Sequence, residues 1–211
     1  MKRRAPLTMM LLAIITLMWL YEASVHAQYD NDKLAQLGAI LPGTLQRGEY
    51  WRLLAAMFLH GGWIHWASNS WALYQLGTLY EILFGTRRFA IVYFISGICA
   101  SAASATHLVG EPAVGASGAI FGVLGAFIFS IYRSPRYRGQ PWTRGLIGQL
   151  VFWIGLNLVI GFSIPHIDNV AHIGGLITGL LLGFLPHREP PPPPADSVID
   201  VEPRYDHYGS E

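Results

Sequence analysis

Six long stretches of this sequence contain no Asp, Glu, Lys or Arg. Their lengths run from 17 to 28 residues, and they cover residues 5–21, 53–80, 89–110, 112–132, 145–167 and 169–187. An α-helix that rises 1.5 Å per residue needs about 20 residues to cross a hydrocarbon core of about 30 Å. A soluble helix of that length needs a charged, water-facing side, which these stretches lack. The sequence therefore predicts an all-α, polytopic membrane protein with six transmembrane helices, the second stretch beginning in a loop.

The composition excludes several classes of function. Lys and Arg number 14 against 13 Asp and Glu, so a formal net charge of +1 leaves no basic excess for a nucleic-acid partner. A single cysteine, Cys99, rules out an internal disulfide and a thiolate metal cluster. A His-Glu-x-x-His zinc motif does not occur, and Asp168 is the one aspartate near a span. We therefore expect no metal and no cofactor, and a lipid bilayer as the first partner. The sequence does not indicate an oligomeric state.

The basic residues predict the orientation in the membrane. With the amino terminus in the cytoplasm, eleven of the 14 Lys and Arg fall in cytoplasmic segments and three fall outside. Residues 1–4 are then a short cytoplasmic segment, residues 5–187 the membrane domain, and the first span a signal-anchor rather than a cleaved signal peptide. Residues 188–211 are Pro-rich and then acidic, which predicts a disordered cytoplasmic tail. The predicted location is the plasma membrane, specifically a bacterial inner membrane. The 22–52 connection is too long for a plain turn, and we expect it at the outer membrane surface.

Polar side chains inside the spans need a reason, because a charge at the bilayer centre costs about 2.5–3.5 kcal/mol on insertion scales. His65 and Asn69 share one face of the second span, since they are four residues apart. Ser117 lies near the start of the fourth span, and His172 near the start of the sixth. In the predicted topology all four lie toward the outer leaflet.

Each of these residues also has a purely structural interpretation. A serine in a transmembrane helix usually bonds to its own backbone or packs against a neighbour, and Ser117 alone would be read that way. His65 and Asn69 can hold two helices together by hydrogen bonds. His172 can serve in one interhelical hydrogen bond. Their common depth in the membrane favours one shared site.

Small residues recur every four positions on the two spans that carry Ser117 and His172. The ridges are Gly118, Gly122 and Ala126 on the fourth span and Gly175, Gly179 and Gly183 on the sixth. Such ridges let two helix backbones approach closely, which predicts that Ser117 and His172 reach hydrogen-bonding distance. The pair would then join a nucleophile to a general base. Free N–H groups at the start of a helix, with His65 and Asn69 as further donors, would stabilise an oxyanion.

These residues resemble the rhomboid family of intramembrane serine proteases. The motifs that carry the resemblance are Trp51-Arg52, His60, His65-x-x-x-Asn69, Glu81, GASGAIFG at 115–122 and AHIGGLITG at 171–179. They occur in the family's order, over about residues 50–185. The resemblance implies a six-helix core and a dyad in which Ser117 is the nucleophile and His172 the general base. It also implies transmembrane protein substrates and an active site that opens to the outer side.

The resemblance implies roles for further residues as well. His65, Asn69 and the Ser117 N–H would form the oxyanion side, and Glu81 would be structural. The residues expected to shape the site without taking part in the chemistry are Trp51, Arg52, Gly115, Gly118, Phe121, Gly175 and Gly179. Of these, Trp51 and Arg52 belong to a first loop that dips into the membrane, and Phe121 would lie against the catalytic imidazole.

Asp168 lies one turn before His172 and suggests a triad. The family pattern needs no acid, however, and helix capping is the preferred interpretation of this residue. Two other functions stay open. One is a noncatalytic binding module for membrane proteins on the same scaffold. The other is a small transporter lined by the same histidines, which predicts repeat symmetry and discontinuous helices that the sequence does not indicate.

Overall fold

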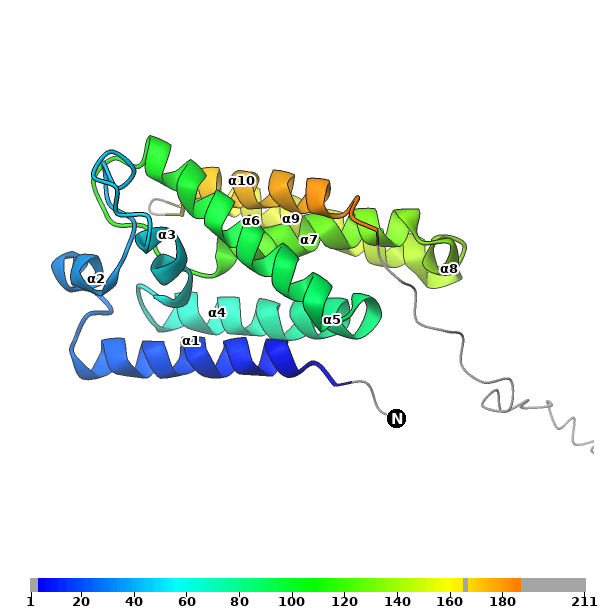
Figure 1. Ribbon diagram of the computed structural model, residues 1–211, viewed down its shortest axis with the longest axis horizontal. Helices are drawn as coiled ribbons and strands as arrows, with labels where there is room; N and C mark the ends of the chain where they lie inside the picture. Colours follow the sequence, from blue (N-terminus) through cyan, green and yellow to red (C-terminus); the bar gives the residue numbers. More distant parts are fainter. Residues whose placement is uncertain (1–3, 165–166, 187–211) are drawn as a thin grey trace, which may run out of the picture.

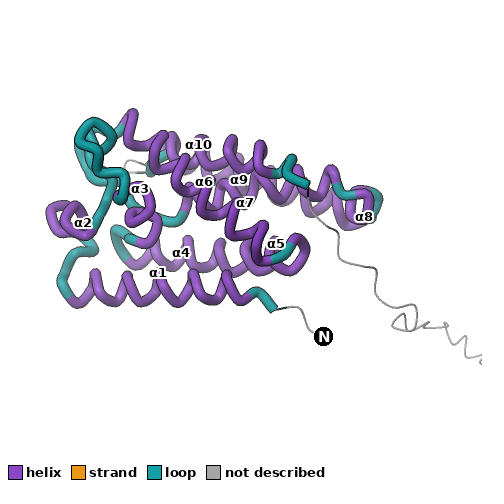
Figure 2. Tube along the Cα trace, in the orientation of Figure 1, coloured by secondary structure: helices purple, strands orange, loops and turns teal. Residues whose placement is uncertain are grey.

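The computed structural model describes residues 4–164 and 167–186. Within these ranges every regular element is a helix, and the β pairing is limited to one isolated bridge between Ile40 and Ala113. The predicted fold class, an all-α membrane bundle, is confirmed (Figure 1; Figure 2). The tail predicted at 188–211, and residues 1–3 of the predicted N-terminal segment, lie outside the described residues.

Six helical segments correspond to the six charge-free stretches. They are α1 (Pro6–Ser24), α4 (Trp63–Ala72) continuing through a π-helical turn (Leu73–Gly77) into α5 (Thr78–Phe84), α6 (Thr86–His107), α7 (Ser117–Arg133), α9 (Pro141–Ser163) and α10 (Asn169–Leu182). The connections contain α2 (Asn31–Leu37), α3 (Arg52–Ala55) with a 3-10 turn over Ala56–Phe58, and α8 (Pro135–Arg138). By length and composition α1, α6 and α9 can cross a membrane, whereas α7 and α10 are apolar but only 17 and 14 residues long.

The helix ends differ from the ends of the charge-free stretches. Residues 112–116 form a loop before α7, because Ala113 pairs with Ile40 of the first loop through two backbone hydrogen bonds. Helix α9 starts at Pro141 and includes Arg144. Helix α1 runs past its predicted end at residue 21 and includes Glu22. The predicted length of about 20 residues was therefore wrong for α7 and α10, because a lack of charge marks apolar surroundings and not the ends of a helix.

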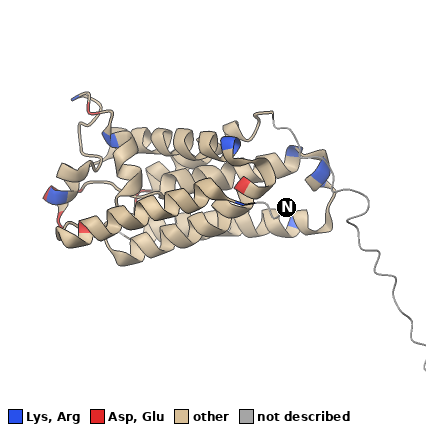
Figure 3. Cartoon of the chain, turned by 60° about the horizontal axis from the view of Figure 1, so that its bottom comes forward, with Lys and Arg blue, Asp and Glu red and all other residues tan. Residues whose placement is uncertain are grey.

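Helix α7 forms the centre of the bundle. Most of its side chains are buried, and its most extensive contacts are with α6 and α10. In the view of Figure 1, α1 and α4 lie side by side along one side of the molecule, and α10 lies on the other. Lys, Arg, Asp and Glu occur mostly near the ends of the helices and leave long uncharged stretches between them (Figure 3). The bundle thus presents an apolar exterior to a membrane.

Two buried charged residues hold helix ends together. Glu81 on α5 accepts hydrogen bonds from the backbone N–H groups of Leu7 and Thr8, at 3.0 and 2.8 Å, and from the Thr8 hydroxyl at 2.8 Å. Its carboxylate therefore caps the amino terminus of α1, where unpaired N–H groups and the helix dipole favour an anion. Arg88 on α6 donates to the carbonyl oxygens of Gly183 and Leu185, at 3.0 and 2.6 Å, and so caps the carboxyl end of α10.

Candidate active site

Ser117 is the first residue of α7, and the backbone before it is shaped by Gly115. Gly115 has φ +123°, a conformation that L side chains rarely adopt. A Cβ atom there would lie 2.6 Å from His65 Nε2 and 3.3 Å from Asn69 Nδ2. Both side chains of the predicted His65-x-x-x-Asn69 pair therefore lie against the backbone that leads into Ser117. Only glycine allows this approach.

His172 reaches Ser117 from the neighbouring helix. Its Nε2 lies 2.9 Å from Ser117 Oγ, a hydrogen-bonding distance, and only 7% of the His172 surface is exposed. The Phe121 ring, one turn after Ser117, stacks on the imidazole with the ring centroids 4.3 Å apart and the planes 4° from parallel. Phe121 therefore restricts rotation of the imidazole and holds Nε2 toward the serine hydroxyl.

The close approach of α7 and α10 depends on glycines. A Cβ atom on Gly175 would collide with the carbonyl oxygen of Gly118, and one on Gly179 with the carbonyl oxygen of Gly122. The two ridges of small residues noticed in the sequence therefore face each other. Backbone against backbone, they bring the start of α7 beside the start of α10, and with it the two side chains of the dyad.

Asp168 does not extend the Ser117–His172 pair to a triad in this structure. Its Oδ1 accepts the backbone N–H of Ala171 at 2.9 Å and caps α10, as the sequence predicted. Its Oδ2 and the Nδ1 of His172 are both buried without a hydrogen-bond partner among the described residues. The imidazole is therefore held by stacking and by Ser117 rather than by a carboxylate.

Donors for an oxyanion gather beside Ser117. The first N–H groups of a helix have no partner within the helix, and α7 begins at Ser117 with no side-chain cap. The Asn69 amide nitrogen is buried and has no hydrogen-bond partner in the described part of the chain. Together with His65, these groups can stabilise negative charge that develops on a carbonyl oxygen near Ser117 Oγ.

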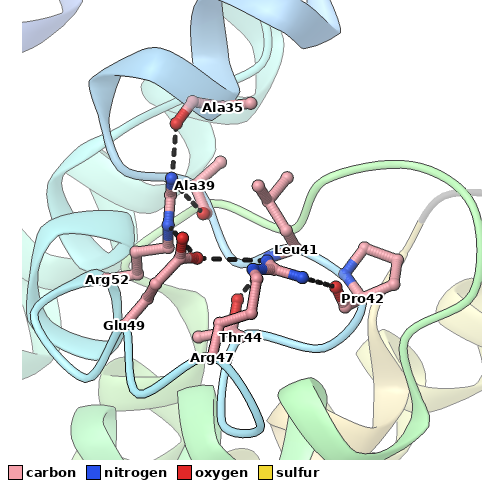
Figure 4. Close-up of polar contacts among 8 residues, drawn as sticks. All are labelled: Ala35, Ala39, Leu41, Pro42, Thr44, Arg47, Glu49 and Arg52. Atoms are coloured by element: carbon pink, nitrogen blue, oxygen red, sulfur yellow. Dashed lines mark hydrogen bonds and ion pairs between the residues drawn. The ribbon is translucent and has the colours of Figure 1, made fainter.

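The first loop is tied together by its arginines, as Figure 4 shows. Arg52 donates to the Ala35 and Ala39 carbonyl oxygens at 2.5 and 3.1 Å, and to Glu49 at 2.8 Å. Arg47 donates to Glu49 at 3.0 Å. The Arg47 guanidinium, and after it Arg52, hold the pKa of the Glu49 carboxyl below its usual range. This network keeps the loop folded.

Trp51 packs against the same loop. Its ring packs on Gly38, where a Cβ atom would lie 2.6 Å from Cζ3, and Arg52 lies 4.7 Å over the ring centroid. The side chain is nevertheless 54% exposed. Trp51 and Arg52 therefore have contacts typical of structural residues.

A cleft that the sequence analysis missed opens beside Ser117. It has about 360 Å³ of empty space, including the part open to solvent, and small residues dominate its lining. Gly97, Ala100, Ser101 and Ser104 of α6 form one wall. Their spacing of three or four residues places them on one face of the helix, which the sequence could have indicated. Only the fold shows that this face of α6 points to Ser117.

Comparison with known proteins connects this geometry to a family. A family model described as the Rhomboid domain matches residues 47–189. The chain is 39% identical over 150 residues to "Rhomboid protease GluP" of Bacillus subtilis (strain 168), which covers 71% of this chain and 29% of that protein. It is 38% identical over 168 residues to "RHOMBOID-like protein 6, mitochondrial" of Arabidopsis thaliana, covering 76% and 52%. It is also 33% identical over 143 residues to "Rhomboid-type serine protease 2" of Emericella nidulans, covering 67% and 28%. The matched region thus spans between about a quarter and half of the length of these relatives.

Proposed function

This chain belongs to the rhomboid family, and on that premise we propose that it is an intramembrane serine endopeptidase with a Ser117–His172 dyad. One observation carries the proposal: the 2.9 Å contact between Ser117 Oγ and His172 Nε2, buried between two helices at the edge of a cleft. A serine that only packed between helices would need no imidazole, and a histidine that only paired with another helix would need no cleft.

In the proposed reaction His172 Nε2 accepts the hydroxyl proton as Ser117 Oγ attacks the carbonyl carbon of a substrate peptide bond. Negative charge develops on the carbonyl oxygen, where the Ser117 N–H, His65 and Asn69 donate hydrogen bonds. His172 then protonates the departing amine, which leaves an acyl group on Ser117. A water molecule then gives a proton to His172 as its oxygen attacks the acyl carbon. The ester bond to Ser117 Oγ breaks, His172 returns the proton to Oγ, and the acyl group leaves as a new carboxyl terminus.

The proposed substrates are transmembrane proteins cut near the outer membrane surface. A helical substrate must unwind locally, because its carbonyl groups are engaged in helical hydrogen bonds. Substrate residues of low helix propensity reduce this cost by up to about 1 kcal/mol for each Gly and about 3 kcal/mol for each Pro. Small residues line the cleft beside Ser117, which supports a small residue at the cleavage site.

We also propose the membrane arrangement. As a rhomboid the chain is an integral membrane protein, and the distribution of Lys and Arg supports cytoplasmic termini and an active site that opens outward. The proposed membrane is a bacterial inner membrane. Residues 5–187 would form the membrane domain, between a four-residue cytoplasmic start and a cytoplasmic tail at 188–211.

The test is covalent labelling of the purified full chain with a fluorophosphonate, combined with cleavage of a transmembrane reporter. Wild-type protein should be labelled, Ser117→Ala should not, and His172→Ala should be labelled far more slowly. Ser163→Ala is the matched control, because the Ser163 hydroxyl is exposed and donates to the Val159 carbonyl oxygen within α9. The double variant Ser117→Ala/His172→Ala should cleave no more slowly than either single variant, since the two groups act as one unit. Labelling or cleavage that survives in Ser117→Ala would refute the dyad. Wild-type protein that is neither labelled nor able to cleave the reporter would favour the noncatalytic binding module or the transporter.

A further inference from the structure

A buried carboxylate ends the first helix, outside the proposed dyad and its oxyanion donors. Glu22 lies in the last turn of α1 and has no exposed surface. Both of its carboxylate oxygens accept the backbone N–H of His60, at 3.2 and 3.1 Å. The two residues are 38 positions apart in the sequence. This contact fastens the end of α1 to the segment that leads into α4.

His60 is as deeply buried as Glu22. It has no exposed surface, and neither ring nitrogen makes a hydrogen bond of good geometry among the described residues, although the ring interacts with the backbone of Phe58. Burial of polar groups without full hydrogen bonding is costly, more so in a membrane protein. Apolar residues at positions 22 and 60 would pack this segment at a lower cost in free energy. Stability alone therefore does not explain Glu22 and His60.

The His60 ring points to the candidate site. Its centroid lies 5.2 Å from that of the His65 ring, and the planes meet at 69° in an edge-to-face arrangement. His65 Nε2 in turn lies against Gly115, two residues before Ser117. A continuous series of contacts therefore runs from α1 through Glu22, His60 and His65 to the oxyanion side of Ser117.

We infer that Glu22 and His60 are positioning residues for the active site. Glu22 fixes the backbone of His60, and the His60 ring holds the His65 ring against Gly115, where it donates to the oxyanion. The expected effect on catalysis rests on the proposed function. The fixed orientation of the His65 ring does not, and it can be measured in an inactive variant.

The kinetic experiment uses two pairs of variants. Glu22→Leu removes the acceptor of the His60 N–H, whereas Glu22→Gln keeps one oxygen in place. His60→Ala removes the ring, whereas His60→Phe keeps an aromatic edge against His65. Loss of a single oxyanion donor costs about 10² to 10³ in rate. Loss of a residue that acts through that donor should cost less. We therefore expect kcat to fall about tenfold in Glu22→Leu and His60→Ala, with KM little changed. In Glu22→Gln and His60→Phe we expect kcat to return toward the wild-type value.

A comparison of His60→Ala with and without His65→Ala distinguishes positioning of His65 from a general loss of structure. Rates are expressed per Ser117 titrated with fluorophosphonate, so that unfolded protein does not count. In a His65→Ala background, His60→Ala should change kcat by less than about twofold, because the donor it positions is gone. A tenfold fall in both backgrounds would overturn the inference, as would equal rates for Leu and Gln at position 22.

The second measurement does not depend on catalysis. In Ser117→Ala protein, modification of His65 by diethylpyrocarbonate is followed by mass spectrometry. Adding Glu22→Leu or His60→Ala should accelerate modification of His65 several-fold, whereas Glu22→Gln should leave it unchanged. If these variants accelerate modification of His65 but fluorophosphonate does not label Ser117 in the wild-type protein, the proposed protease activity is rejected and the positioning of His65 stands. Unchanged modification in both Glu22→Leu and His60→Ala would reject the positioning while the protease stands.

Discussion

Replacing Gly179 by alanine would place a methyl group against the carbonyl oxygen of Gly122, far inside the 3.4–4 Å of ordinary van der Waals contact. The obstructing atom belongs to the backbone, so no side-chain rotation can relieve the collision. Helix α10 must instead move away from α7 by about 1 Å or more. Gly179 lies two turns below His172 and touches no group in the proposed chemistry, yet the same movement separates His172 Nε2 from Ser117 Oγ, now 2.9 Å apart.

The expected magnitudes follow from this displacement. Overpacking of a close contact costs about 1–3 kcal/mol. For a domain of this size that corresponds to a fall in Tm of about 2–12 °C. A misplacement of about 1 Å between reacting groups can lower the rate about 10²-fold. We therefore expect Gly179→Ala to melt earlier and to cleave about 10²-fold more slowly, and Gly179→Leu to be worse in both respects.

The matched control is Gly148→Ala on α9, where no atom lies within 4 Å of the added Cβ. Each Gly→Ala change in a helix interior gains up to about 1 kcal/mol of helix propensity. The difference between the two alanine variants therefore isolates the overpacking. Thermal melting in detergent and cleavage of a transmembrane reporter are measured for both. If Gly179→Leu matches wild type in melting and turnover, the glycine ridge does not hold the two helices together and the reasoning fails.

Three further predictions concern residues outside the dyad. Asp168→Asn keeps a capping oxygen on α10 and should retain most cleavage activity, whereas a loss of several orders of magnitude in folded protein would establish a triad. His65→Ala and Asn69→Ala should each lower the cleavage rate about 10² to 10³-fold while Ser117 still accepts the covalent label slowly; wild-type rates in both would leave α4 with a packing role only. Arg88→Met removes the charged donor from the end of α10 and should cost about 1.5–3 kcal/mol or more, seen as earlier melting, and an unchanged Tm would contradict the proposed cap.

Local patterns in the sequence were enough to predict the class of fold and the central pair of side chains. Absence of charge over lengths that match a bilayer depends on composition alone, and it predicted six helical segments. A spacing of four residues fixes a helix face whatever the helix packs against. The glycine ridges therefore indicated which helices meet, and Ser117 and His172 followed from their positions at the starts of those helices.

Contacts between distant segments decided the rest. Helix α7 begins at Ser117 because Ile40, in another loop, pairs with Ala113. Whether Asp168 completes a triad depended on the direction of its side chain, which the structure uses to cap α10. Glu22 marked the edge of a span in the sequence, but the fold buries it against the backbone of His60. The partners of Ala113 and Glu22 lie tens of positions away in the sequence. Sequence spacing therefore determined which chemistry was available, and the folded structure determined where each side chain points.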